Sequence, residues 1–119
     1  MTSTRDVRLY IDDILESIDR IQHVTSAITK KKFFDDLMLQ DAVVHRIEII
    51  GEAVKHIPTQ LRIKYPNVPW KEIAGTRDKI THQYFEVDTE QVWYIIKNDL
   101  MPLKKNIADM LRELDRQDA

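Results

Sequence analysis

The sequence predicts an all-α protein, an up-and-down bundle of four main helices plus a short helix. Hydrophobic residues make up 43% of the 119 positions, and only 2 glycines and 4 prolines interrupt them. This composition is typical of a folded, helix-rich chain and not of a disordered one. In three long stretches, apolar residues recur at alternating spacings of three and four, as they do on helices that bury one stripe in a bundle. The length suits a single domain spanning residues 1–119.

The first two stripes predict helices over residues 6–28 and 39–57. The residues of the first stripe are Val7, Ile11, Ile14, Ile18, Ile21 and Ile28, with Thr25 in the remaining slot. The residues of the second are Val43, Ile47, Ile50, Val54 and Ile57. Residues 30–36 break the pattern and are expected to form a connection, in which Phe33 and Phe34 cap one end of the core. Pro58 ends the second helix, because proline disfavours a helical residue before it.

The second half predicts a short helix, a motif helix and a long final helix. The short helix covers residues 59–64, and a turn-rich link over residues 65–69 follows it. The motif helix begins near Trp70, with Pro69 at its first position, and continues through Arg77 to end near His82 or Tyr84. Asp88 and Gln91 have the spacing of a capping box, which starts a helix over residues 88–114. Its stripe consists of Val92, Ile96, Leu100, Leu103, Ile107, Met110 and Leu114, and Pro102 is expected to kink it.

Composition also limits the functional classes. The net charge is −2, so nucleic acid would have to be bound locally and not by a uniformly basic surface. With no cysteine, a disulfide framework and a thiolate site are excluded. No apolar run of membrane-spanning length and no signal-peptide core are visible, so we expect a cytoplasmic protein without membrane contact. We expect no cofactor and no metal: His45, Glu48, Glu52 and His56 share a helix face but lack an H-x-x-x-H pair, and a solvated polar face explains them.

The chemistry is concentrated in the window from Gly75 to Tyr84, which can be written R-D-x-x-x-H-x-Y. Arg77 is a permanent cation whose planar donors match a phosphate. His82 can accept or donate a proton near neutral pH. Asp78 is four residues before His82, so on a helix it could orient the imidazole. The Tyr84 hydroxyl is a donor, an acceptor or a target for modification.

A single straight helix does not bring these groups together. At about 100° per residue, Arg77 and His82 stand roughly 140° apart, whereas Arg77 and Tyr84 share a face. Either the helix ends near His82, or a second copy of the chain completes the site. We favour a homodimer in which both copies of the motif face one cleft.

The window resembles the R-x(4-6)-H motif of the HEPN superfamily, and its R-x(4)-H-x-Y form is similar to the HepT branch, the toxins of HepT/MntA toxin–antitoxin pairs. The resemblance extends over nearly the whole chain, through the segments at residues 49–53, 68–75 and 92–96. That branch often carries asparagine where this chain has Asp78.

The resemblance implies a metal-independent endoribonuclease with RNA in a dimer cleft. His82 would be the general base at a ribose 2′-hydroxyl or the general acid at the leaving oxygen, and Arg77 would stabilise the phosphoryl charge. The partner would be a nucleotidyltransferase antitoxin of the MNT type that transfers AMP to Tyr84, and a higher assembly with it stays open. Glu52 would lie close to the motif, where pairing with Arg77 and an ordinary surface position are about equally expected.

Two other interpretations stay open at this point. The chain could be a catalytically inactive HEPN module that binds its nucleotidyltransferase partner, a nucleotide or RNA without cleaving it. Alternatively, the window could be purely structural, with Arg77 and Asp78 as a local ion pair and Tyr84 at the edge of the core. The ordered set of family-like segments favours the toxin over both.

Overall fold

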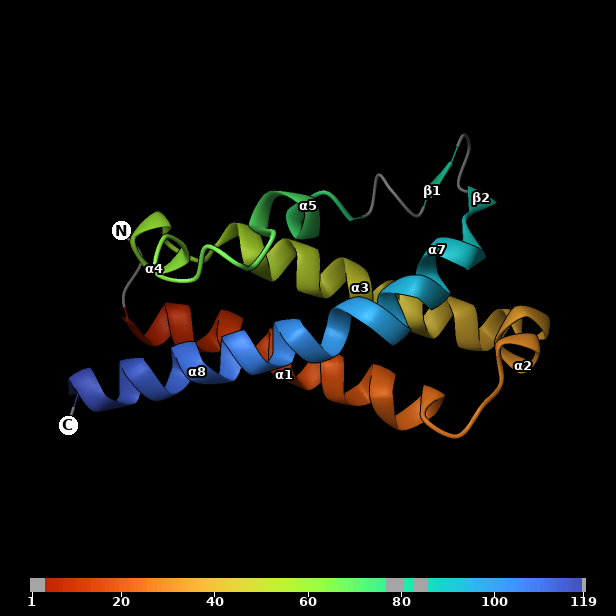
Figure 1. Ribbon diagram of the computed structural model, residues 1–119, viewed down its shortest axis with the longest axis horizontal. Coiled ribbons are helices and arrows are strands. Elements are labelled where there is room, and N and C mark those ends of the chain that lie inside the picture. The colour runs from red at the N-terminus through yellow and green to blue at the C-terminus, as the bar shows by residue number, and fades with distance from the viewer. Residues whose placement is uncertain (1–3, 77–80, 83–85, 119) are drawn as a thin grey trace.

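The chain runs up and down along one long axis (Figure 1). The computed structural model describes residues 4–76, 81–82 and 86–118, with the backbone alone for 4–6, 81–82, 86 and 118. Helix α1 (Thr4–Thr25) runs one way and α3 (Leu37–Lys55) returns beside it. A last rod, made of α7 (Thr89–Tyr94), η1 (Ile95–Asp99) and α8 (Leu100–Asp118), also runs antiparallel to α1. The shorter elements are α2 (Lys30–Asp35), α4 (Thr59–Arg62), α5 (Trp70–Ala74), β1 (Thr81–His82) and β2 (Glu86–Val87).

The segment between α3 and the last rod is not a single long helix but consists of short elements. After α3, the chain passes α4 and returns along α3 through α5 toward the β1–β2 pair, which lies beside the start of α7 (Figure 1). The described part is therefore all-helical apart from two strands of two residues each. No helix within it is both long and apolar enough to cross a membrane.

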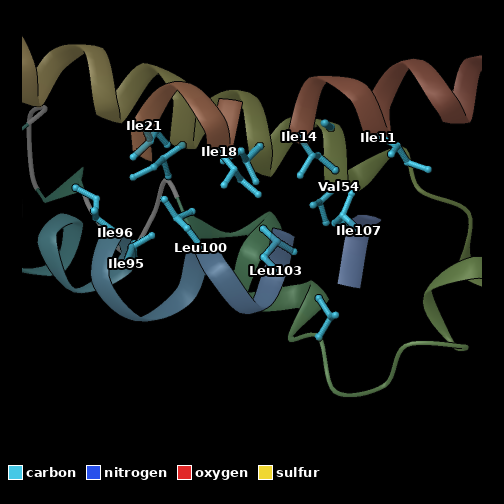
Figure 2. Packing of buried hydrophobic residues seen from close by; sticks show 14 of the residues in the cluster. Ile11, Ile14, Ile18, Ile21, Val54, Ile95, Ile96, Leu100, Leu103 and Ile107 are labelled. Carbon is cyan, nitrogen blue, oxygen red and sulfur yellow. The ribbon is translucent and has the colours of Figure 1, made fainter. Parts of the chain in front are cut away.

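The core is made by the three predicted stripes. Every member of the second and third stripes is buried, as is the first stripe through Thr25. Isoleucines from α1 point at the branched side chains of η1 and α8, and Val54 of α3 closes the layer (Figure 2). Thr25 satisfies its buried hydroxyl by donating to the Ile21 carbonyl at 2.7 Å. The predicted burial pattern is confirmed, although α1 ends at Thr25 and Ile28 lies beyond it, half-buried.

Residues 30–36, expected as a plain connection, contain helix α2. Its N-cap is Thr29, whose hydroxyl accepts a hydrogen bond from the Lys32 N–H at 3.1 Å. At its other end, the Gln40 amide donates to the carbonyls of Phe33 and Phe34. Phe33 is fully buried and its ring lies 5.4 Å from that of Trp93. The expectation that the phenylalanines cap the core is therefore confirmed for Phe33, and burial of its ring stabilises a helix too short to form alone.

Pro102 was expected to kink the final helix. The structure has a π-helical segment, η1, shortly before this residue. A proline at position 102 cannot donate to the Asn98 carbonyl, and its ring would crowd that group in an α-helix. The Leu100 N–H instead donates to the carbonyl of Ile95, five residues earlier, within η1. The wider turn lets the adjacent Ile95 and Ile96 both face the core.

The prediction of one motif helix running from Trp70 to His82 or Tyr84 is wrong. Helix α5 ends at Ala74 and Gly75 is its C-cap, because glycine is a weak helix former. The Thr76 hydroxyl donates to the carbonyls of Glu72 and Ile73, so these two carbonyls in the last turn of α5 have a side-chain partner. His82 lies instead in β1, where it pairs with Glu86 of β2 in antiparallel register.

Helix α5 rests directly on the backbone of α3 at Gly51. A Cβ atom at this position would approach the Ile73 carbonyl oxygen to 3.1 Å and that of Ala74 to 3.6 Å. The first of these contacts is tighter than an ordinary van der Waals contact, so any side chain at this position would require the α5 backbone to shift. Gly51 therefore sets the distance between α3 and the end of α5, from which the chain enters the motif window.

We predict that Gly51→Val destabilises the protein by about 1–3 kcal/mol, because its methyl groups must displace the α5 backbone. Urea unfolding followed by circular dichroism measures the change. The control is His45→Val, which introduces the same β-branched residue at an exposed position of α3. Equal midpoints for Gly51→Val and the control would contradict the close approach.

Candidate active site

The motif window is held at both ends by packed elements. On the entering side, the Trp70 indole N–H donates to the carbonyls of Arg62 and Tyr65, each at 3.1 Å. On the leaving side, Val87 packs against the core, and the Asp88 carboxylate caps α7 by accepting from the Gln91 N–H at 3.1 Å. Of the capping box expected from the spacing of Asp88 and Gln91, the N-cap bond to the Asp88 carboxylate is confirmed. The window is thus anchored by α5 at one end and by α7 at the other.

The structure places some of the predicted site residues and not others. Arg77, Asp78 and Tyr84 lie outside the described residues. The backbone of His82 is described, and it belongs to a strand. The helical spacing that made Asp78 and His82 neighbours therefore does not apply to His82, and the relation between Arg77 and Tyr84 lies outside the described residues. A single helix through His82 is therefore ruled out, and completion of the site by a second copy of the chain stays a prediction.

A hollow of about 300 Å³ lies on α3 next to the end of α5. Its lining includes His45, Glu48, Ile49, Glu52 and Ala74. Ala74 is three residues before Arg77 in the sequence. The hollow therefore adjoins the point at which the chain enters the motif, and Glu52 is an acid on its wall.

Glu52 is well exposed, and within the described part of the chain it pairs with Lys55 of the same helix at 3.3 Å. Its side chain retains 65% of its accessible surface. An exposed pair of this kind contributes at most about 1 kcal/mol, so Lys55 would not prevent Glu52 from meeting a better partner. Pairing between Glu52 and Arg77 stays a prediction, since Arg77 lies outside the described residues.

The segment that leads into α5 is tied to α8 by Tyr65 and Lys64. Both side chains donate to the carboxylate of Glu113, at 2.8 and 3.0 Å. These hydrogen bonds, led by that from Lys64, lower the pKa of Glu113. Burial, followed by the bond to the carboxylate, raises the pKa of Tyr65. These two hydrogen bonds hold the start of the segment that leads to the motif window, although they lie away from the motif itself.

Several lysines on the surface that could contact nucleic acid locally are paired with acids. The ammonium nitrogen of Lys30 lies 3.0 Å from a carboxylate oxygen of Glu90, and that of Lys31 lies 2.7 Å from a carboxylate oxygen of Asp35. Lys104 lies 2.8 Å from Asp19 across the helices. These pairs are those of an ordinary solvated surface. Among the described residues, no group of three or more acidic or histidine side chains is arranged to hold a metal ion.

One feature next to the motif was not visible in the sequence. Segment η1 forms a wall of a cleft whose opposite wall is the end of α5, with Asn98 and Asp99 on one side and Thr76 on the other. Adjacent apolar residues at 95 and 96 and the proline at 102 were the available signals. Neither signal identifies a π-helix in place of a kink, because both are compatible with either distortion.

Fold and motif together define a helical domain with an arginine, a histidine and a tyrosine in one anchored window. Residues 14–110 match the family model described as ribonuclease HepT-like. The chain belongs to this HepT-like family of the HEPN superfamily.

Named relatives agree with the assignment. A Thermococcus cleftensis protein named "probable ribonuclease HepT" is 42% identical over 80% of this chain and 86% of its own length. A Methanocaldococcus jannaschii protein named "putative RNase" is 40% identical over 96% of this chain and 94% of its own. Another from that organism, named "gamma-glutamylcyclotransferase and putative RNase", is 46% identical over 94% of this chain, which spans 50% of its length. No solved structure matches the chain.

We predict that Glu52 and Arg77 are energetically coupled. A double-mutant cycle of Glu52→Gln and Arg77→Gln, read out by urea unfolding, should give a coupling of about 0.2–1 kcal/mol, the range for exposed ion pairs. The matched cycle of Glu52→Gln with Lys55→Gln reports the pair seen in the structure. A coupling free energy of zero in the Arg77 cycle would show that Glu52 does not interact with Arg77.

Proposed function

We propose that this chain is a metal-independent endoribonuclease that acts as the toxin of a toxin–antitoxin pair. The proposal rests on one observation: a HepT-like chain carries Arg77, His82 and Tyr84 at the R-x(4)-H-x-Y spacing. The names of the relatives, which refer to ribonucleases, support it. The anchoring of the window between α5 and α7 adds a rigid support on each side of the motif.

The proposed reaction is cleavage by the RNA's own 2′-hydroxyl. The 2′-oxygen attacks the adjacent phosphorus while a base removes its proton. The bond from phosphorus to the 5′-oxygen breaks, and an acid delivers a proton to that oxygen. The products are a 2′,3′-cyclic phosphate and a free 5′-hydroxyl. His82 supplies the base or the acid, and Arg77 stabilises the charge on the phosphoryl oxygens. An orienting role of Asp78 stays a prediction, because His82 lies in a strand and not on the helix that the spacing assumed.

Two copies of the chain would supply both a base and an acid to one cleft. The outer face of α3 supports a homodimer. Ile49 is only half-buried there, and Met38 retains 84% of its accessible surface on the same helix. These apolar side chains lie off the core stripe of α3, on a face that also carries Glu52, and exposed apolar groups of this kind can mark a protein–protein contact. A second copy that covers Ile49 would lie beside the hollow at Glu52 and Ala74.

Regulation would act on Tyr84. In the proposed step, its phenolic oxygen attacks the α-phosphorus of ATP on a nucleotidyltransferase partner. Diphosphate leaves, and the phenolic proton passes to a base of the partner. The AMP group adds bulk and negative charge in the cleft, which would obstruct RNA.

We predict that His82→Ala lowers RNA cleavage by about 10²–10⁴-fold while the fold is retained, because one acid–base group typically supplies that factor. Purified protein is incubated with several RNA classes in EDTA, after its intact mass has shown that no AMP is attached. Exposed His23 in α1 provides the matched control, His23→Ala.

The outcomes separate the functions. Equal cleavage by wild type and His82→Ala would reject the catalytic role of His82. Absence of cleavage by unmodified wild type on every RNA class would favour the inactive module that binds its nucleotidyltransferase partner.

We predict that Tyr84→Phe cannot be neutralised by AMP transfer, since phenylalanine has no acceptor oxygen. Intact mass after incubation with the cognate nucleotidyltransferase and ATP should show AMP on wild type and none on the variant. Tyr94→Phe is the matched control, because Tyr94 retains 55% of its accessible surface. Full modification of Tyr84→Phe would show that another residue is the acceptor.

A further inference from the structure

A cleft of about 300 Å³ separates α5 from η1 and the start of α8, and we refer to it as the α5–η1 cleft. Its floor is formed by buried Ile47 and Ile50 of α3, together with Leu103 of α8. Thr76 lines it, and this residue is directly followed by Arg77 in the chain. The cleft therefore opens next to the entrance of the motif window.

The lining is apolar with a polar rim that accepts more hydrogen bonds than it donates. Four amide side chains line the cleft, those of Asn67, Gln91, Asn98 and Asn106, together with the acids Glu72 and Asp99. The NH₂ groups of Asn98 and Asn106 already donate to the carbonyls of Tyr94 and Pro102, at 3.1 and 2.9 Å. Each therefore keeps its amide oxygen and one N–H for a ligand, and the two carboxylates add only acceptors.

This chemistry excludes some ligands and favours others. Among the described residues that line the cleft there is no lysine or arginine, so this part of the lining offers a phosphate two acids and no cation. A flat, apolar group that carries N–H donors would find apolar walls and several acceptors. Nucleobases with an amino group have this character, whereas uracil offers one N–H and two carbonyl oxygens. The volume lies at the lower end for small-molecule sites.

The π-helical turn is an independent observation at the same place. Segment η1 contributes Ile95, Asn98 and Asp99 to the wall. Single π-turns inside α-helices occur frequently at functional sites. Here the turn, closed by the bond from the Leu100 N–H to the Ile95 carbonyl, sets where the polar residues 98 and 99 stand relative to α5.

We propose that the α5–η1 cleft receives an amino-bearing base of the RNA strand, which is splayed out of the stack next to the scissile phosphate. The inference rests on the proposed ribonuclease function and adds a specificity to it. Single-stranded RNA is generally recognised through unstacked bases whose edges are hydrogen-bonded by protein groups. In this arrangement Asn98 and Asn106 read the base and the motif residues handle the phosphate.

The test compares oligoadenylate with oligouridylate. The variant pair is Asn98→Leu and Asn106→Leu, because leucine keeps the side-chain size and favours a helix. Binding is measured by fluorescence anisotropy in proteins that also carry His82→Ala, so that the RNA stays intact. Cleavage is measured in proteins that retain His82. Gln60→Leu, at an exposed position of α4 outside the cleft, is the control.

We expect wild type to bind and cleave oligoadenylate in preference to oligouridylate. Each leucine variant should lose about 3- to 10-fold on oligoadenylate, the equivalent of one hydrogen bond, with little change on oligouridylate. The control should keep the wild-type preference.

Three outcomes would overturn the inference. Cleavage without any preference between the two RNAs would leave the ribonuclease function intact and reject the base site. A preference that persists in both leucine variants would place specificity elsewhere. Loss of self-association or of antitoxin binding in the variants, with RNA preference unchanged, would identify the cleft as a protein interface. Because binding is measured apart from cleavage, an inactive enzyme does not obscure these results.

Discussion

The contact between the backbones of α5 and α3 at Gly51 is the constraint on which the site depends. It brings the Ile73 carbonyl to within 3.1 Å of where a Cβ atom would stand. From this contact the chain enters the motif window, and it leaves through β2 and the capped start of α7. The hollow at Glu52 and the α5–η1 cleft both use the end of α5 as a wall. A shift of α5 would therefore alter both spaces and the motif entrance at once.

The two spaces differ in chemistry, and the difference suggests a division of roles. The hollow on α3 contains the charged side chains of Glu48, Glu52 and Lys55 and adjoins the face on which we propose that a second copy packs. The α5–η1 cleft is apolar with amides and acids at its rim. In the proposed enzyme, the first space would support the dimer cleft and its arginine, and the second would select the base. Affinity for phosphate would then come from the motif and not from the paired surface lysines.

The sequence predicted the core well because burial of a helix stripe is a local, periodic signal. The three stripes are buried except for Ile28 at the end of the first, and the capping of α7 by Asp88 was readable from a spacing of three. Helix α2 was missed because its stability comes from Phe33 packing on Trp93, a contact between distant residues. The β1–β2 pair was missed for a similar reason, since strands of two residues carry no periodicity. Residue types indicated candidate chemistry at Arg77 and His82, which stays a prediction, whereas helical spacing gave the wrong local geometry for His82, which lies in β1.

The identity of the RNA ends after cleavage tests the central claim most directly. Purified, unmodified protein is incubated with a short RNA in EDTA, and the fragments are analysed by mass spectrometry. Attack by the 2′-hydroxyl, with His82 and Arg77 as the chemical groups, predicts a 2′,3′-cyclic phosphate on one fragment and a 5′-hydroxyl on the other. Replacing the ribose at the cleaved position by 2′-deoxyribose should abolish the reaction. A 5′-phosphate with a 3′-hydroxyl, or cleavage of the deoxy substrate, would contradict the account.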